Sequence, residues 1–238
     1  MMKIDCMEKF ISAIKKEYSR EGSAAVSKIY YRGQSNCNYK LMPTLSRKID
    51  GYIEDDENYI PFEQDIIRRA KLEFPDIFED NNYFDEIALM QHYGLPTRLL
   101  DVTENPLVAL YFACNGNRDF DGEFFIFNAG YNANIYTSYD KKRIKKSEKV
   151  AFIRAKTFSA RQRVQQGMFM WFPDKELKEL DKKSPIISKI LTVPSNCKEL
   201  LLNELKMLGI SPKTIFPDNT DICCKELIKD ITKDAYSI

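Results

Sequence analysis

The sequence predicts a single α+β domain, and three observations favour this class. Apolar residues recur at helical spacing in several segments, such as residues 5–20 and 61–74. Runs rich in aromatic and β-branched residues are concentrated between Glu123 and Val193. The 238 residues contain no internal repeat, no low-complexity stretch and no Gly/Ser linker. We therefore expect one domain with an N-terminal helical layer and a sheet.

The composition is ordinary for a soluble globular chain, with 44% hydrophobic and 30% charged residues. The 36 basic and 35 acidic side chains leave a net charge of +1, so no overall field attracts nucleic acid or a membrane. No apolar run is long enough to span a bilayer, and no signal peptide is recognisable. The six cysteines lack CxxC spacing and there is one histidine. We expect a cytoplasmic protein with reduced thiols, no metal and no membrane partner.

Helical segments dominate the first part of the chain. Residues 5–20 have an amphipathic pattern, and residues 29–31 are a short β-prone run. Residues 52–59 form an acidic exposed loop. A second helix spans residues 61–74 and is bounded by prolines, which suit a first helical turn and end a helix. A third helix, residues 82–91, leads into a polar loop.

That polar loop and the helix after it are the centre of the chain. Asn105 is a suitable helix cap and Pro106 a suitable first residue. Residues 107–113 are apolar on all sides, which predicts a buried helix whose N-terminus favours anions. The loop brings several ligand-type side chains to this helix: His92, Tyr93, Thr97, Arg98, Asp101 and Thr103.

The last part of the chain alternates strands with polar segments. The expected strands are residues 123–127, 150–155, 168–172 and 186–193. Residues 141–149 are a basic run, most often a solvated loop, and residues 159–166 are polar. Asn196 and Glu199 are expected to cap a helix that ends at Gly209, and a last helix is expected over residues 220–234.

Polar residues beside glycines have both structural and functional interpretations. Arg32 would tie its strand to the loop by pairing with Asp101, and the same pair would also suit a ligand. His92 is either a hydrogen-bonded scaffold residue or a ligand contact. Gln165 and Gln166 are either surface residues or part of a site, and their place before Gly167 favours the site.

Two parts of the sequence resemble a known family. Tyr31-Arg32-Gly33-Gln34 and the stretch from Gln91 to Ala113 are similar to the FRG domain, a bacterial and phage family named after its (Phe/Tyr)-Arg-Gly triplet. Gln165-Gln166-Gly167 and Ile215-Phe216-Pro217-Asp218 also resemble features of that family. The resemblance implies an N-terminal helix over residues 1–28 and an FRG domain over residues 29–238. It does not by itself imply an activity.

A second resemblance concerns mechanism and fold. ADP-ribosyltransferases of the Arg-Ser-Glu type carry an Arg on an early strand, a Ser/Thr on a later strand and a Glu on a third. Arg32 and Thr103 resemble the first two, whereas Gln165 and Gln166 stand where the glutamate is expected. This resemblance implies a small sheet core with flanking helices. The missing carboxylate matters because a neutral amide stabilises a developing positive charge poorly.

These resemblances imply an NAD- or nucleotide-binding enzyme or effector, of toxin or phage-defence type. It would act as an ADP-ribosyltransferase or NAD glycohydrolase, on a protein or nucleic-acid acceptor. The implied catalytic residues are Arg32, Thr103 and Gln166. The implied ligand-binding residues are Tyr31, Gln34, His92, Tyr93, Thr97, Arg98, Asp101 and Gln165. The alternatives are a non-catalytic ligand-sensing or protein-interaction module, and a nucleic-acid-binding protein that uses residues 141–149.

The sequence finally predicts a geometry. Arg32, a group from the loop of residues 92–103, and Gln165 or Gln166 should converge on one cleft beside the start of the helix at residues 107–113. Gly33, Gly94 and Gly167 would leave room there for a ligand.

Overall fold

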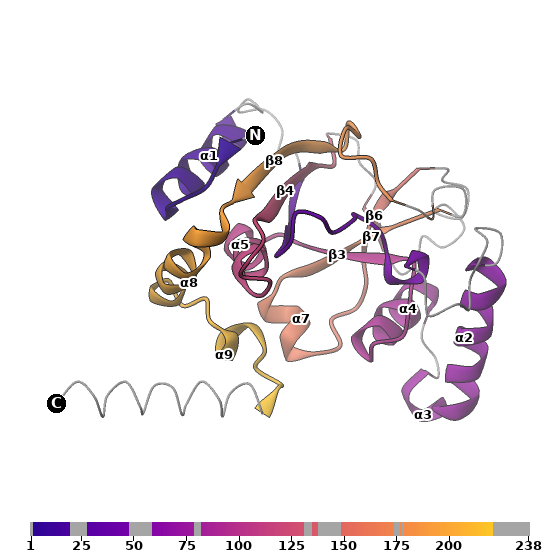
Figure 1. Cartoon of the computed structure of the whole chain (residues 1–238). Helices are drawn as coiled ribbons and strands as arrows, with labels where there is room; N and C mark the ends of the chain where they lie inside the picture. The colour runs from indigo at the N-terminus through magenta and orange to yellow at the C-terminus, as the bar shows by residue number, and fades with distance from the viewer. Residues whose placement is uncertain are drawn as a thin grey trace.

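The structure is a computed structural model that describes residues 2–19, 28–47, 59–78, 82–130, 135–137, 149–173, 177 and 179–220. An eight-stranded sheet in the order β1-β8-β4-β2-β3-β7-β6-β5 forms its centre (Figure 1). The strands are β1 (Met2–Lys3), β2 (Ile29–Gln34), β3 (Leu99–Thr103), β4 (Gly122–Asn128), β5 (Tyr136–Thr137), β6 (Ala151–Arg154), β7 (Gly167–Trp171) and β8 (Ile187–Val193). The α+β class is confirmed, although this sheet is larger than the small core that was expected.

The helices match most of the expected segments. They are α1 (Met7–Ser19), α2 (Tyr59–Glu73), α3 (Pro75–Phe78), α4 (Tyr83–His92), α5 (Pro106–Cys114), α7 (Ala160–Val164), α8 (Lys198–Met207) and α9 (Pro212–Ile215), with 3-10 turns η1 (Thr44–Ser46) and η4 (Ser195–Cys197). Figure 1 shows α1, α5 and α8 gathered at one end of the fold and α2, α3 and α4 at the other.

Some expectations about these elements were wrong, and others concern residues outside the described ranges. Residues 99–103 form strand β3 instead of a loop. The β-prone run at residues 29–31 is confirmed as part of β2. The polar segment 159–166, for which no secondary structure was predicted, contains helix α7, capped by the Ser159 side chain, which accepts from the amide of Gln162. Helix α8 begins after Cys197 with no side-chain cap, so Asn196 does not cap it. The helix expected at 220–234, the basic residues 141–148 and most of the acidic loop lie outside the described residues.

The sheet consists of two halves joined by one residue pair. β2 pairs with β4 along its whole length, from Ile29↔Asn128 to Gln34↔Glu123. β3 likewise pairs with β7 from Leu99↔Trp171 to Thr103↔Gly167. Between β2 and β3, however, the register contains only Tyr31↔Thr103. We call this junction the seam, because the two strands separate beyond that pair.

Helix α5 is central, as its composition predicts. Its N-cap Asn105 accepts from the amides of Leu107 and Val108, at 3.0 and 3.4 Å. Six of its side chains are buried in the core that it shares with α1, α8, β2 and β4: Val108, Ala109, Leu110, Tyr111, Ala113 and Cys114. It covers the β2–β4 half of the sheet, and a second core containing Phe84 and Ile87 of α4 covers the β3–β7 half. Because residues in register share a face, both helices lie on the face that carries Tyr31 and Thr103.

The buried tyrosines of β2 make stability sensitive to high pH. Tyr30 is 1% exposed, and burial raises its pKa to about 12; burial also raises the pKa of Tyr31. A raised pKa means that the unfolded chain loses the phenolic proton first, so stability is complete below pH ~10 and falls as the pH rises towards 12. We expect Tyr30 alone to contribute a loss of about 2 kcal/mol across that window.

Urea unfolding at several pH values between about 9 and 12 measures this loss. Tyr30→Phe is the matched variant, since it keeps the ring and removes the titrating hydroxyl. Its free energy of unfolding should fall less steeply with pH than that of the unaltered protein. Equal slopes for the two proteins would show that Tyr30 does not titrate in this range.

Candidate functional site

A cavity of about 280 Å³ lies over the seam, between α4 and α5. The sheet forms its floor through residues of β2, β3 and β7, and the segment of α7 closes one side. Its lining residues are Tyr31, Arg32, Gly33, Ala88, Gln91, His92, Asp101, Val102, Thr103, Val108, Ala109, Phe112, Ser159, Arg161, Gln162, Gln165, Gly167 and Phe169. The predicted convergence of Arg32, the 92–103 segment and Gln165 beside this helix is confirmed.

Arg32 occupies the seam where β2 and β3 separate. Its Nη1 donates to the main-chain carbonyl of Asp101 at 2.6 Å, an oxygen on the strand that faces β2. The guanidinium therefore spans a gap that strand pairing leaves open. Its Nε is buried and has no partner among the described residues, and desolvation lowers the pKa of Arg32 to about 10. The structure thus places a desolvated cation with unused donor capacity in the cavity.

The Asp101 side chain belongs to a hydrogen-bond chain of its own. Its Oδ1 accepts from Nε2 of Gln91 at 2.8 Å, and Oε1 of Gln91 accepts from the Thr97 hydroxyl. The Thr97 amide donates to Oγ1 of Thr44 at 3.1 Å. The expected Arg32–Asp101 ion pair is therefore replaced by a contact to the Asp101 main chain, which leaves the Asp101 carboxylate oriented by Gln91 in the cavity.

The Thr103 hydroxyl holds the end of β3 to the segment before β7. It donates to the Gln165 carbonyl at 2.6 Å and accepts from the Asn105 amide at 2.9 Å. The Gln165 side chain lines the cavity and donates through Nε2 to the Ile215 carbonyl at 3.0 Å. Thr103 and Gln165 therefore fix the cavity wall where three segments meet: the start of α5, the end of α7 and α9.

Five of the residues proposed from the sequence do not line this cavity. Gln34 is buried, with its amide donating to the Lys40 carbonyl, and Thr97 is buried in the hydrogen-bond chain just described. Arg98 is buried and paired with Glu63. Tyr93 is 58% exposed and contacts Phe78 edge-on. Gln166 is exposed outside the lining, has a φ of 47°, and contributes its carbonyl to the Glu104 amide.

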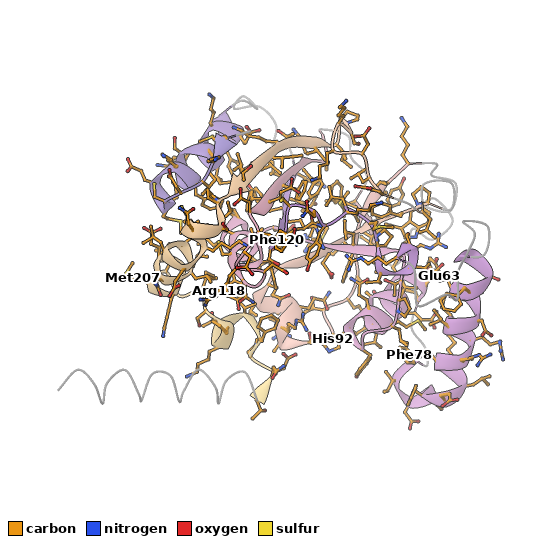
Figure 2. The ribbon with its side chains drawn as sticks, viewed as in Figure 1. Glu63, Phe78, His92, Arg118, Phe120 and Met207 are labelled. Atoms are coloured by element: carbon orange, nitrogen blue, oxygen red, sulfur yellow. The ribbon has the colours of Figure 1, made fainter. Side chains whose placement is uncertain are left out.

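The remaining proposed residues do lie in the cavity, together with residues that the sequence analysis did not select. Arg32, Asp101, Thr103, Gln165 and His92 line it, as does the buried Tyr31. Figure 2 shows His92 at the end of α4. The polar or aromatic lining residues that were missed are Gln91, Phe112, Ser159, Arg161, Gln162 and Phe169. The polar composition of residues 159–166 was visible in the sequence, but only the folded structure shows that Arg161 lines the cavity.

Of the three glycines expected to leave room for a ligand, Gly33 has a different role. A Cβ on Gly33 would stand 1.8 Å from the Ala109 carbonyl oxygen, so Gly33 makes room for helix α5 and not for a ligand. Gly94 has a φ of 84° after the end of α4, with no atom near its Cβ position. A Cβ on Gly167 would make ordinary contacts with Gln162 at 3.5 Å.

The charges of the lining favour an anionic or polar ligand. Arg32 and Arg161 supply two cations, and Asp101 is the carboxylate among the described lining residues. No group of three or more metal-ligating side chains occurs in the described part of the chain. Within those same ranges, the helices are too short or too polar to cross a bilayer.

The comparison with family models decides the assignment, since residues 27–122 match the FRG domain. The chain contains an FRG domain. No curated protein and no solved structure matches the chain. The match includes β2, β3, α4 and α5, so it supplies Arg32, His92, Asp101 and Thr103, whereas Arg161 and Gln165 come from beyond it.

The structure gives each residue of the FRG triplet a physical role. Tyr31 is fully buried beneath α5, with its hydroxyl 3.2 Å from the Tyr18 hydroxyl. Arg32 fills the seam, and Gly33 allows the helix backbone to pack directly on β2. The triplet therefore combines a core residue, a cavity cation and a close backbone contact in consecutive positions.

Proposed function

We propose that this FRG-domain protein binds NAD or a related nucleotide in the cavity over the seam, as an ADP-ribosyltransferase-like enzyme or effector. One observation carries the proposal. The three motifs lie on consecutive strands of the sheet, β2, β3 and β7, and the register aligns Tyr31, Thr103 and Gly167 in one row. Arg32 follows the first of these residues and Gln165 and Gln166 precede the last, so the order resembles the Arg-Ser-Glu arrangement.

The chemistry would depend on two charged groups. Arg32 would hold a phosphate or ribose oxygen through donors that the Asp101 carbonyl does not use. Cleavage breaks the bond between ribose C1′ and nicotinamide, whose ring nitrogen takes the electron pair; water or an acceptor then bonds to C1′ and loses a proton. The positive charge that develops on the ribose needs a carboxylate, and Asp101 is the one among the described lining residues.

Binding of NAD tests the proposal directly. Arg32→Gln removes the cation and keeps a donor, and is expected to weaken NAD binding about tenfold or more, since hydrogen bonds to charged groups contribute about 1.5–3 kcal/mol. Thermal shift and calorimetry with NAD measure the effect. Arg118→Gln is the control, because Arg118 is an exposed arginine outside the cavity. No binding of NAD to the unaltered chain, or equal affinities for both variants, would contradict the proposal.

Turnover is a separate question from binding. Labelled NAD incubated with the protein and a cell lysate should give labelled ADP-ribose on an acceptor, or free ADP-ribose if water is the acceptor. We expect Asp101→Asn to reduce nicotinamide release at least about a hundredfold while NAD still binds, since the amide accepts from Gln91 but carries no charge. Activity that is unchanged in Asp101→Asn would remove this carboxylate from the mechanism.

A non-catalytic ligand-sensing or protein-interaction module is the second candidate. The Thr103 hydroxyl is committed to the Gln165 carbonyl and the Asn105 amide, and the Gln166 side chain lies outside the cavity lining. Both observations favour a rigid binding site over a reacting one. NAD binding without release of nicotinamide in the presence of lysate would support this candidate. The nucleic-acid alternative rests on residues 141–149, nearly all outside the described residues, and stays a prediction from the sequence.

A further inference from the structure

A second cavity, of about 410 Å³, adjoins the first, and we call it the outer cavity. Its described lining residues are His92, Arg161, Phe216, Asp218, Asn219 and Thr220. His92 and Arg161 line both cavities, so these two side chains stand at the passage between them. The inner cavity alone is slightly smaller than the usual ligand site of roughly 300–1,000 Å³, whereas the two together fall within that range.

One wall of the outer cavity is a guanidinium that lies over the face of an aromatic ring. The Arg161 guanidinium carbon lies 4.8 Å from the centre of the Phe216 ring. The edge-on contact of Phe216 with Phe112, at 6.1 Å and 83°, holds that ring against α5. Planar bases stack on aromatic rings and on guanidinium faces. The guanidinium face of Arg161, supported from behind by Phe216, therefore suits stacking with the ring of a nucleobase.

The passage between the cavities suits phosphate. Arg161 has no carboxylate partner among the residues that the structure describes, so its donors are available to a phosphate in two parallel hydrogen bonds. Beyond the passage, the side chains of Asp218 and Asn219 offer acceptors for base amino groups or ribose hydroxyls.

The outer wall is also anchored to the inner site. The Gln165 side chain donates to the Ile215 carbonyl, and the Thr103 hydroxyl donates to the Gln165 carbonyl. The Phe216 segment is thereby attached, through Gln165, to the end of β3. This hydrogen-bonded connection holds the two cavities at a fixed spacing. A ligand that occupies both cavities requires such a fixed spacing.

We propose that one dinucleotide occupies the two cavities in a fixed direction. Its purine ring stacks on the Phe216–Arg161 wall of the outer cavity, and its diphosphate lies at the passage beside Arg161 and His92. Its second ribose and base enter the inner cavity, towards Arg32. This inference rests on the proposed function and gives a role to the Phe216-Pro217-Asp218 segment.

Calorimetry on the full chain with NAD, ADP and nicotinamide riboside tests this inference. Arg161→Gln is expected to weaken the binding of NAD and of ADP about tenfold or more. The affinity for nicotinamide riboside, which has no phosphate, should stay unchanged. Arg163→Gln is the matched control: Arg163 is also an exposed arginine of α7, but it lines neither cavity. Phe216→Leu should weaken the binding of ADP by about tenfold, through loss of stacking. ADP should displace NAD.

The outcomes separate this inference from the proposed function. Failure of every probe to bind the unaltered chain would overturn both. Tight NAD binding with equal effects of Arg161→Gln and Arg163→Gln would overturn the inference alone. The inference alone is also overturned if ADP binds without displacing NAD, or if Arg161→Gln weakens nicotinamide riboside as much as ADP. Because Arg161 is exposed, its variant should fold normally, so the test remains decisive even if Phe216→Leu lowers stability.

Discussion

Removing either partner of the Arg98–Glu63 pair is expected to lower the free energy of unfolding by about 3–5 kcal/mol. Both side chains are buried, at 4% and 5% exposure. Arg98 Nε lies 2.9 and 2.8 Å from the two carboxylate oxygens of Glu63, its Nη2 also donates to Oε2, and its guanidinium lies 5.4 Å from the centre of the Trp171 ring. Truncating one partner leaves the other as an uncompensated buried charge, which is why the expected loss is large.

Urea unfolding of Arg98→Ala and Glu63→Ala measures this loss, and Arg68→Ala is a control on the same helix as Glu63. Arg68 pairs with Asp65 at 61% and 41% exposure, and such a surface pair should contribute less than about 1 kcal/mol. Replacing both buried partners, as in Arg98→Met with Glu63→Leu, should cost much less than the two single losses combined, because no charge remains buried. Additive losses would show that the two residues do not act as a pair.

Gly33→Ala is expected to be as damaging, with a loss of at least about 3 kcal/mol, at the upper end of the range for overpacked cores. The added methyl group would stand 1.8 Å from the Ala109 carbonyl oxygen and 2.5 Å from the Ala113 amide nitrogen. Both atoms belong to the backbone of α5, which cannot rotate away as a side chain would. The helix must move off β2 as a whole, and it is buried on nearly every side.

Gly167→Ala is the matched control for this variant, since its added methyl group would meet Gln162 at an ordinary 3.5 Å. We expect it to change the free energy of unfolding by less than about 1 kcal/mol. Chemical unfolding of both variants compares the two positions. Similar stabilities would contradict the direct packing of α5 on Gly33.

The sequence predicted those elements whose signals are local. Helix α5 has a capping residue, a proline at its start and an apolar composition on every side, and each of these properties is readable from neighbouring residues. The segment of strand β3 resembles a loop in the sequence, because polar residues, glycine and proline are concentrated between residues 92 and 103. Only pairing with β7 on one side, together with the cavity that receives Asp101, makes this segment a strand.

The site was predictable in outline but not in its details. The order of Arg32, the 92–103 segment and Gln165 was sufficient to expect convergence. The role of Arg98 was not predictable, because its partner Glu63 lies 35 residues away in helix α2. Arg161 lies on a five-residue helix, too short for a periodic signal. Gln166 is exposed and has a positive φ, and a glutamine in the sequence does not indicate such a backbone conformation.

At the seam, the two halves of the sheet are connected differently on the two faces of the sheet. On the face away from the cavity, one apolar core joins both halves without interruption and includes Tyr30 and Phe125 on one side and Leu100 and Met170 on the other. On the cavity face, the halves are joined by the Tyr31↔Thr103 pair, the Arg32 contact and the turn that leads from β3 into α5. The far core is therefore the continuous connection between the halves, whereas α4 and α5 pack on separate halves of the cavity face. Tyr31, Arg32 and Thr103 all line the cavity, so an occupant would contact the residues that connect the two halves on this face.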